Sequence, residues 1–261
     1  MAVNPLAVQL IDAFEKDQNP SAYFPKLSRS AIAEGLRARV DNPNLINQGD
    51  TSLCGSAAVV TALAKTRVVD YVKAVIELYN FGAAEIRKMG SGSGNSWYIA
   101  PGKDVRNYKP SPKTAEVDWI IMASIRDSEN WLLDYEKESN DASAITRGAT
   151  VADWLRKAGY AEVIDKTNNV FSKDVEELQQ AADLYKKDYQ VCLLIDTNAL
   201  NGKTSFISYP KHWVILASDI DYVPFMRMEV YSWGEKLILP KQKMELVSFV
   251  RYFYGFVAAK Y

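Results

Sequence analysis

The apolar residues of this chain follow two different patterns. Up to about residue 188 they recur every three or four positions, which predicts amphipathic helices. From Tyr189 onward they form short runs of β-branched and aromatic residues separated by turns, which predicts antiparallel strands over residues 191–195, 213–218, 226–231, 237–239 and 249–257. The two patterns together predict an α+β protein with a helical part followed by an antiparallel sheet.

Cap residues delimit the predicted helices. Asn4 and Pro5 are typical of an N-cap and a first helical residue, and a second helix is expected to start at Ser28 or Ser30 and to run to Val40. A further helix is predicted over residues 69–79, with residues 80–82 as its stop, and another over residues 117–135. One more is predicted from a capping box of Thr150 and Asp153 to Gly159, and a last one after a cap at Ser172. The Gly/Ser-rich run at residues 90–95 is interpreted as a flexible surface loop.

A polar turn meets an almost unbroken apolar run at Cys54. Residues 49–52, Gly-Asp-Thr-Ser, are turn and N-cap types, and residues 57–64 are mostly helix formers, so a buried helix is expected to begin just before the cysteine. In its first turn, unpaired N–H groups and the positive end of the helix dipole favour a thiolate, which is the nucleophilic form of cysteine. Cys54 is therefore a candidate nucleophile.

A thiol nucleophile normally needs a base, and this chain has a single histidine, His212. It opens a strand-like run after a loop that contains proline, so it would be both held and accessible. Gln48, six residues before Cys54, can fold back and donate with the Cys54 N–H to an oxyanion. Cys192 lies inside the apolar run 191–195 and is interpreted as a buried structural thiol. Each of these residues alone is more often inert than catalytic, and the combination carries the prediction.

The order of Gln48, Cys54-Gly55, His212 and the segment 231–234, Tyr-Ser-Trp-Gly, resembles the papain-like cysteine peptidases, whose pattern is Gln, Cys, His and then Asn-Ser-Trp-Gly. The resemblance covers about 75 residues, 44–66 and 189–240. The piece Cys-Gly-x-Ala also resembles the bacterial double-glycine peptidases of the same clan. The resemblance implies a papain-like fold in which a helical lobe carries the nucleophile and packs against an antiparallel sheet lobe.

The chain departs from that pattern at Tyr231, which stands where the family has the asparagine that orients the histidine. Ser232, Tyr231 or a carboxylate such as Asp196 could take this role, or the enzyme could work as a dyad. Ser232 is the preferred candidate because its side chain is short and points to the strand face opposite Tyr231. Asp219 is disfavoured because it would lie at the turn of the 213–233 hairpin, roughly 23 Å along the strand.

A looser resemblance, through residues 118–119 and 124–128, connects the chain to papain-like toxins delivered between bacteria by contact-dependent secretion. It implies a cognate immunity or inhibitor protein and a delivery machinery as partners. The predicted function is a cysteine protease that cleaves a protein substrate, as a toxin in competing bacteria. The alternatives are a peptidoglycan amidase or endopeptidase with the same chemistry, and a non-catalytic binding module on the same fold.

Composition argues against several other kinds of partner and against a cofactor. The chain has 31 basic and 32 acidic residues and a net charge of −1, so neither nucleic acid nor an anionic membrane is an expected partner. With two cysteines, one histidine and no phosphate-binding loop, we expect no metal and no cofactor. The beginning of the chain does not resemble a signal peptide, so we expect synthesis in a reducing cytoplasm and secretion by another route.

A length of 261 residues is ordinary for a single two-lobed enzyme. We expect one papain-like unit composed of an N-terminal helical segment (residues 1–45), a mainly helical lobe (46–188) and the sheet lobe (189–261). The N-terminal segment would serve either as a packing layer or as a docking segment for the delivery machinery.

Overall fold

The computed structural model describes residues 4–87, 96–130, 146–203, 205 and 207–261. It is a mixed α+β structure with an antiparallel sheet, as the hydrophobic pattern predicts. The chain forms two compact units: Met1–Lys137 with Lys157–Gly159, and Glu138–Arg156 with Tyr160–Tyr261. The predicted glycine-rich loop at residues 90–95 and the end of the predicted helix 117–135 lie outside the described residues.

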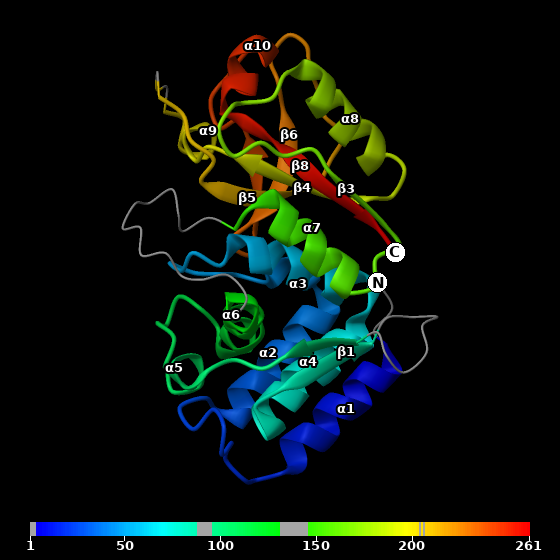
Figure 1. Ribbon diagram of the computed structural model, residues 1–261, viewed down its shortest axis with the longest axis vertical. Coiled ribbons are helices and arrows are strands. Elements are labelled where there is room, and N and C mark those ends of the chain that lie inside the picture. Colours follow the sequence, from blue (N-terminus) through cyan, green and yellow to red (C-terminus); the bar gives the residue numbers. More distant parts are fainter. Residues whose placement is uncertain (1–3, 88–95, 131–145, 204, 206) are drawn as a thin grey trace. The chain divides into compact units, whose positions relative to one another are not determined.

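The first unit is mainly helical. Its elements are α1 (Pro5–Lys16), α2 (Arg29–Asp41), η1 (Pro43–Leu45), α3 (Cys54–Thr66), α4 (Val68–Phe81), β1 (Ala84–Arg87), β2 (Ser96–Ile99), α5 (Lys103–Arg106) and α6 (Glu116–Asn130). Helix α3 lies in the interior and packs against α4 and α6, while α1 packs on α2 and α4 (Figure 1). The short antiparallel pair β1–β2 has no counterpart among the predicted strands, because four residues are too few for a clear alternation.

The N-terminal helix is an integral layer of the first unit. The Arg29 guanidinium lies over the rings of Phe14 and Tyr79, 4.5 and 4.8 Å from their centroids. It also donates to the carbonyl oxygens of Phe14 (3.1 Å) and Asn19 (2.9 Å), which connects α2 to the end of α1. Of the two roles considered for this segment, packing is the one that these contacts support.

The second unit is built on one antiparallel sheet. Its elements are α7 (Gly148–Lys157, whose last residue belongs to the first unit), β3 (Glu162–Asp165), α8 (Val175–Tyr185), β4 (Gln190–Ile195), α9 (Asn198–Asn201), β5 (His212–Leu216), β6 (Met228–Ser232), β7 (Glu235–Leu239), α10 (Leu246–Phe249), η3 (Val250–Tyr252) and β8 (Phe253–Lys260). The six strands have the order β3-β8-β4-β5-β6-β7. The predicted strand 249–257 is shifted, since its first residues form the helical turns of α10 and η3.

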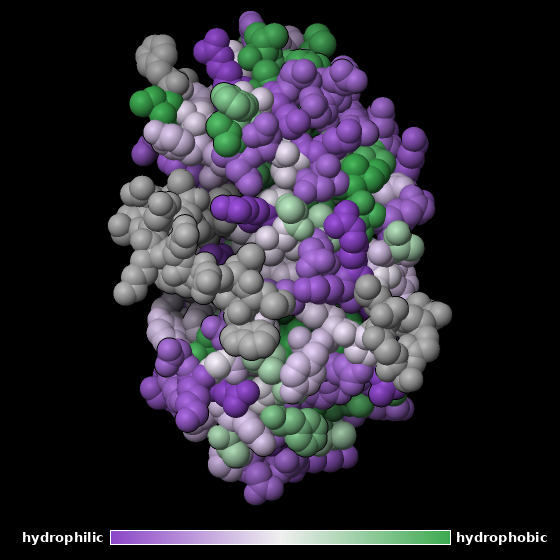
Figure 2. All heavy atoms as spheres, in the orientation of Figure 1, coloured by the Kyte–Doolittle hydropathy of each residue, from purple (hydrophilic) through white to green (hydrophobic). Residues whose placement is uncertain are grey.

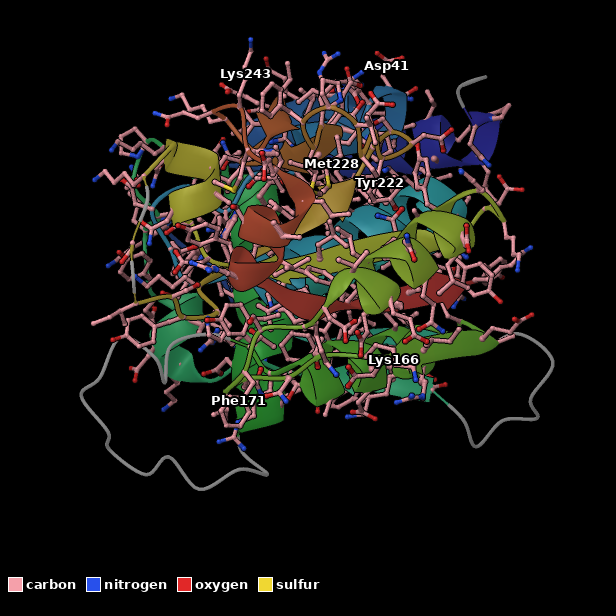
Figure 3. All side chains as sticks on the ribbon, turned by 90° about the horizontal axis from the view of Figure 1, so that it is seen from above. Asp41, Lys166, Phe171, Tyr222, Met228 and Lys243 are labelled. Atoms are coloured by element: carbon pink, nitrogen blue, oxygen red, sulfur yellow. The ribbon has the colours of Figure 1, made fainter. Side chains whose placement is uncertain are left out.

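Helix α8 covers one face of this sheet. It packs against β8 and β4, and its apolar side chains Leu178, Ala181 and Ala182 belong to the core of the second unit. Its outward surface is mostly hydrophilic (Figure 2). In Figure 3 the buried Met228 of β6 lies in the interior, whereas Phe171, 71% exposed, extends from the surface. The predicted boundary between the helical lobe and the sheet lobe at residue 189 is therefore wrong. Helix α8 belongs to the second unit, because its apolar face packs on the sheet.

Several predicted helix ends are confirmed. The Asn4 side chain accepts from the N–H groups of Leu6 and Ala7, the Ser28 hydroxyl accepts from Ala31 N–H, and Gly82 ends α4 in a left-handed conformation (φ 71°). These ends are correct because each cap acts within one helical turn of its own position.

Two other predicted caps are wrong. Thr150 lies inside α7, which begins at Gly148, so the capping box with Asp153 does not form. Helix α8 is capped by Asp174, whose carboxylate accepts from Glu176 N–H (3.0 Å), and not by Ser172. A carboxylate two positions nearer the apolar stripe satisfies the first-turn donors with charge as well as with a hydrogen bond.

Candidate active site

The loop before Cys54 is a tight turn. Gly49 has φ 60°, and a Cβ there would lie 2.1 Å from Thr114 Oγ1, so the backbone approaches its neighbour as only glycine allows. The Gly49 N–H donates to Asn47 Oδ1 (2.7 Å). The carbonyl oxygen of Gln48 accepts from the hydroxyls of Thr51 (2.6 Å) and Thr114 (3.1 Å). The backbone of Gln48 is therefore held on both sides of the turn.

A buried ion pair fixes the start of this loop. Asp118, at the beginning of α6, is fully buried and accepts from Asn47 N–H (3.0 Å). Arg39 of α2 donates to both carboxylate oxygens of Asp118, at 3.0 and 2.6 Å. Burial raises the pKa of Asp118, and the guanidinium of Arg39 opposes that rise. The segment that carries Gln48 is thus anchored to two helices of the first unit.

Cys54 is the first residue of α3, as predicted. Its N-cap is Leu53, which makes no side-chain capping hydrogen bond, so the expectation that residues 49–52 would cap the helix is wrong. The first turn of α3 contains no acidic residue either. The positive end of this helix is therefore not neutralised by a cap carboxylate, which leaves it to act on the adjacent sulfur. Cys54 is 6% exposed and sits on a helix buried on nearly every side.

Two orphaned acceptors belong to the same loop–helix junction. Gln48 is 8% exposed, and neither its Oε1 nor the buried Oγ of Ser56 has a hydrogen-bond partner among the described residues. A buried polar atom left without a partner costs about 1–3 kcal/mol. A bound polar group would relieve that cost, which is the expected property of a site that receives a ligand.

The base candidate, His212, is the first residue of β5. It is 4% exposed, and its Nε2 lies 2.6 Å from the Ser232 hydroxyl on β6. The Trp233 ring stacks on the imidazole with centroids 4.3 Å apart and an interplanar angle of 12°. Trp233 and Gly234 both have positive φ, 50° and 75°, and form the two-residue turn between β6 and β7. That turn brings the indole back over the histidine.

Burial governs the charge of this histidine. It lowers the pKa of His212 to about 4, so the imidazole is neutral at pH 7. When Nε2–H donates to the Ser232 hydroxyl, Nδ1 carries the lone pair and can accept a proton. The arrangement in the second unit is therefore that of an oriented, uncharged base.

The other candidates for orienting His212 lie elsewhere. Asp196 is buried, but its carboxylate accepts from Asn198 N–H (2.8 Å) and Tyr209 N–H (2.9 Å), so it stabilises the loop between β4 and β5. The Tyr231 ring lies 6.0 Å from the Lys236 ammonium, on the strand face opposite Ser232. Pairing of Ile215 with Tyr231 confirms the predicted hairpin that places Asp219 at its distant turn.

Cys192 and Cys54 are both buried thiols, and they occupy different surroundings. Cys192 is fully buried in β4 between β5 and β8, opposite Ile215 and Val257. A central strand offers it no helix N-terminus. Cys54 belongs to the first unit, where the structure places it beside the Gln48 loop. His212 belongs to the second unit, together with Ser232 and Trp233.

Sequence reasoning missed Arg39 and Thr114, which help to hold the nucleophile loop. Asp118 and Arg126 were noted only through the toxin resemblance, without a role. A charged residue in the first turn of an otherwise apolar helix is a signal for a buried ion pair, but its partner on α2 cannot be identified from sequence spacing.

No known protein family matches this sequence, and no curated protein is detectably similar to it. Among the described residues, no three side chains of His, Cys, Asp or Glu gather as a metal site would require. Within the same part of the chain, none of the helices has the length and apolarity needed to cross a bilayer.

Proposed function

We propose that this chain is a papain-like cysteine hydrolase in which Cys54 is the nucleophile and His212 is the base. The observation that carries the proposal is the arrangement at His212: a buried neutral imidazole, hydrogen-bonded at Nε2 to Ser232 and covered by Trp233. Such an imidazole is oriented to take a proton through Nδ1, and Cys54 at the N-terminus of α3 is the thiol whose ionisation its surroundings favour.

The reaction follows from these groups. The Cys54 thiol gives its proton to His212 Nδ1, and the sulfur attacks the carbonyl carbon of the scissile amide. The carbonyl π electrons move to oxygen, and this oxyanion accepts hydrogen bonds from the Cys54 N–H and the Gln48 side-chain amide. Its collapse breaks the C–N bond, and the leaving amine takes the proton from His212. Water, deprotonated by His212, then hydrolyses the thioester and regenerates the thiol.

The proposed substrate is a protein, and the proposed setting is a toxin that acts in a competing bacterium and is neutralised by a cognate inhibitor in its producer. Support comes from the resemblance through residues 118–119 and 124–128, since that segment belongs to α6, which holds the nucleophile loop through Asp118. The near-neutral charge balance gives no support to a nucleic-acid substrate.

Expression in a bacterial host separates this function from its alternatives. A protease of cytoplasmic proteins should arrest growth when it is produced in the cytoplasm, and Cys54→Ala should restore growth at equal protein levels. Arrest only after export to the periplasm would indicate a peptidoglycan amidase instead. Toxicity that persists in Cys54→Ala would indicate a binding module and contradict the proposed chemistry.

Purified variants test the Cys/His pair itself. Cys54→Ala and His212→Ala should each reduce turnover of a cleaved protein by about a thousandfold or more, and the double variant should be no worse, because nucleophile and base act as one unit. Losses that multiply in the double variant would show that the two residues act independently.

A further inference from the structure

We propose that Arg126 is a positioning residue for Cys54: its guanidinium fixes the backbone just before the cysteine and supplies positive charge that stabilises the thiolate. The inference rests on the proposed role of Cys54 as nucleophile, and it assigns to α6 a part in preparing that nucleophile.

Helix α6 holds the nucleophile loop at both ends. At the start of the loop the Asp118 carboxylate accepts from Asn47 N–H (3.0 Å), and at its end Arg126 Nη1 donates to the Ser52 carbonyl oxygen (2.7 Å). Asp118 and Arg126 are eight positions apart, close to two helical turns, so they lie on the same face of α6. The carboxylate of Asp118 accepts from an N–H group at the start of the loop, and the guanidinium of Arg126 donates to a C=O group at its end. The position and the direction of the loop are therefore both fixed.

The contact at Ser52 puts a permanent cation near the sulfur. Ser52 is two residues before Cys54, so their Cα atoms are at most about 7 Å apart, and a guanidinium bonded to the Ser52 carbonyl lies in the neighbourhood of the thiol. Ser52 is exposed and Arg126 is half-buried, so a unit charge about 7 Å away changes a pKa by about half a unit if fully solvated and by about one and a half units at a protein surface, which gives an expected effect of about one unit. Arginine keeps its charge at any pH at which the protein is folded, so the effect is present wherever the thiol titrates.

The α3 N-terminus does not offset this charge with an anion of its own. Its cap, Leu53, contributes no side-chain acceptor, and its first turn has no acidic residue. A thiolate at Cys54 would therefore be the anion that both the helix dipole and Arg126 stabilise.

The carboxylates on the elements packed around α3 are each engaged by another group. Asp118 binds Arg39, and Asp50 in the loop binds Lys113 (2.8 Å). The others have partners away from the loop: on α6, Asp127 accepts from Gly102 N–H, Glu116 from Ser28 N–H, and Glu129 from Lys157 and the Trp97 indole; on α4, Glu77 accepts from Glu85 N–H and Asp70 from Arg67. The ion pairs offset the charges of Asp118, Asp50, Asp70 and Glu129, whereas Asp127, Glu77 and Glu116 accept from neutral N–H groups and keep their charge.

The test is the titration of Cys54 in the full-length chain. Iodoacetamide modification is followed from pH 5 to pH 10, and the modified peptides are separated by mass spectrometry so that Cys54 and Cys192 are read independently. Arg126→Gln removes the charge and retains a donor, and Arg126→Lys retains the charge. Arg106→Gln is the matched control, because Arg106 also donates to a backbone carbonyl of the first unit, that of Gly82 (3.1 Å).

We expect Arg126→Gln to raise the pKa of Cys54 by about one unit and to slow its modification at pH 7 about tenfold. Arg126→Lys and Arg106→Gln should titrate like the parent. An unchanged pKa in Arg126→Gln would overturn the inference, and so would equal rises in the Gln and Lys variants, which would show that geometry alone matters.

If Arg126→Gln does not fold, as judged by circular dichroism, the salt dependence of the Cys54 pKa in the parent protein tests the inference instead. Raising the salt concentration from 20 to 500 mM shortens the screening length severalfold and should raise the pKa of Cys54, whereas a salt-independent pKa would contradict the inference. The measurement requires no hydrolytic activity. An inactive protein with the expected titration would therefore count against the proposed function alone, and an active one with an unaltered titration in Arg126→Gln against this inference alone.

Discussion

At the scale of single residues, the chemistry of this protein depends on how two side chains are held. His212 combines a hydrogen bond at Nε2, a stacked indole and a desolvated ring, and each of these restricts either its orientation or its charge. Cys54 is held by its backbone, at the start of a buried helix whose preceding loop is anchored to α6.

The Ser232 hydroxyl is expected to orient the imidazole. An orienting hydrogen bond contributes about 1–2 kcal/mol, so Ser232→Ala should slow turnover about five- to thirtyfold without abolishing it. Tyr231→Phe is the matched control, since it removes a hydroxyl from the neighbouring position on the opposite strand face, and its turnover should match the parent. Asp196→Asn completes the kinetic comparison, and impairment of that variant alone would reassign the orienting role.

Burial of His212 makes the stability of the second unit depend on pH. The pKa is about 4 in the folded state against an ordinary value of 6.5, so between these values the unfolded chain binds a proton that the folded chain does not. The contribution is fully present above pH 6.5 and is lost as pH falls toward 4. From pH 7.5 to 5.5 the free energy of unfolding should decrease by about 1 kcal/mol.

Urea denaturation at the two pH values measures this effect, with His212→Gln as the variant that should lose it. The interval stays above the range in which ordinary carboxylates titrate, so their contribution is small. Equal pH dependence in the parent and His212→Gln would show that the decrease comes from other groups.

At the scale of elements, the start of a side-chain-capped helix depends on which side chain reaches the first-turn donors. For α8 that side chain is Asp174, with Ser172 two positions outside. Asp174→Ala should therefore reduce the free energy of unfolding by about 1 kcal/mol, whereas Ser172→Ala should change it by a few tenths at most. Urea denaturation of the two variants decides, and the reverse order would move the start of the helix back to residue 172.

At the scale of the whole molecule, the two thiols are distributed one to each unit and should react differently. Cys54 lies at a helix N-terminus beside a loop, whereas Cys192 lies in the buried strand β4, which is paired with β5 on one side and with β8 on the other. Iodoacetamide should modify Cys54 at least about tenfold faster than Cys192 in the native protein, because the thiolate is the reactive form and solvent reaches a central strand only on unfolding. Modification measured by mass spectrometry tests this, and faster labelling of Cys192 would exchange the assigned roles.

Much of what the structure shows was already determined by the sequence, because it depends on local periodicity and local capping. The spacing of apolar residues determines the long helices and most strands of the larger sheet, and Asn4, Ser28 and Gly82 act on the turn next to them. The hairpin that brings Ser232 to His212 also follows from the strand pattern, since the two strands are consecutive in the chain.

The distant segments that support the nucleophile could not be identified before the three-dimensional contacts were known. The hydrogen bonds that join the loop before Cys54 to Thr114, Asp118 and Arg126 connect residues 66 to 74 positions apart. The same holds for the place of α8 on the sheet, which depends on complementary apolar faces. Periodicity shows that a helix has a buried face but carries no information about the surface that buries it, and a buried charge shows that it needs a partner without indicating which residue supplies it.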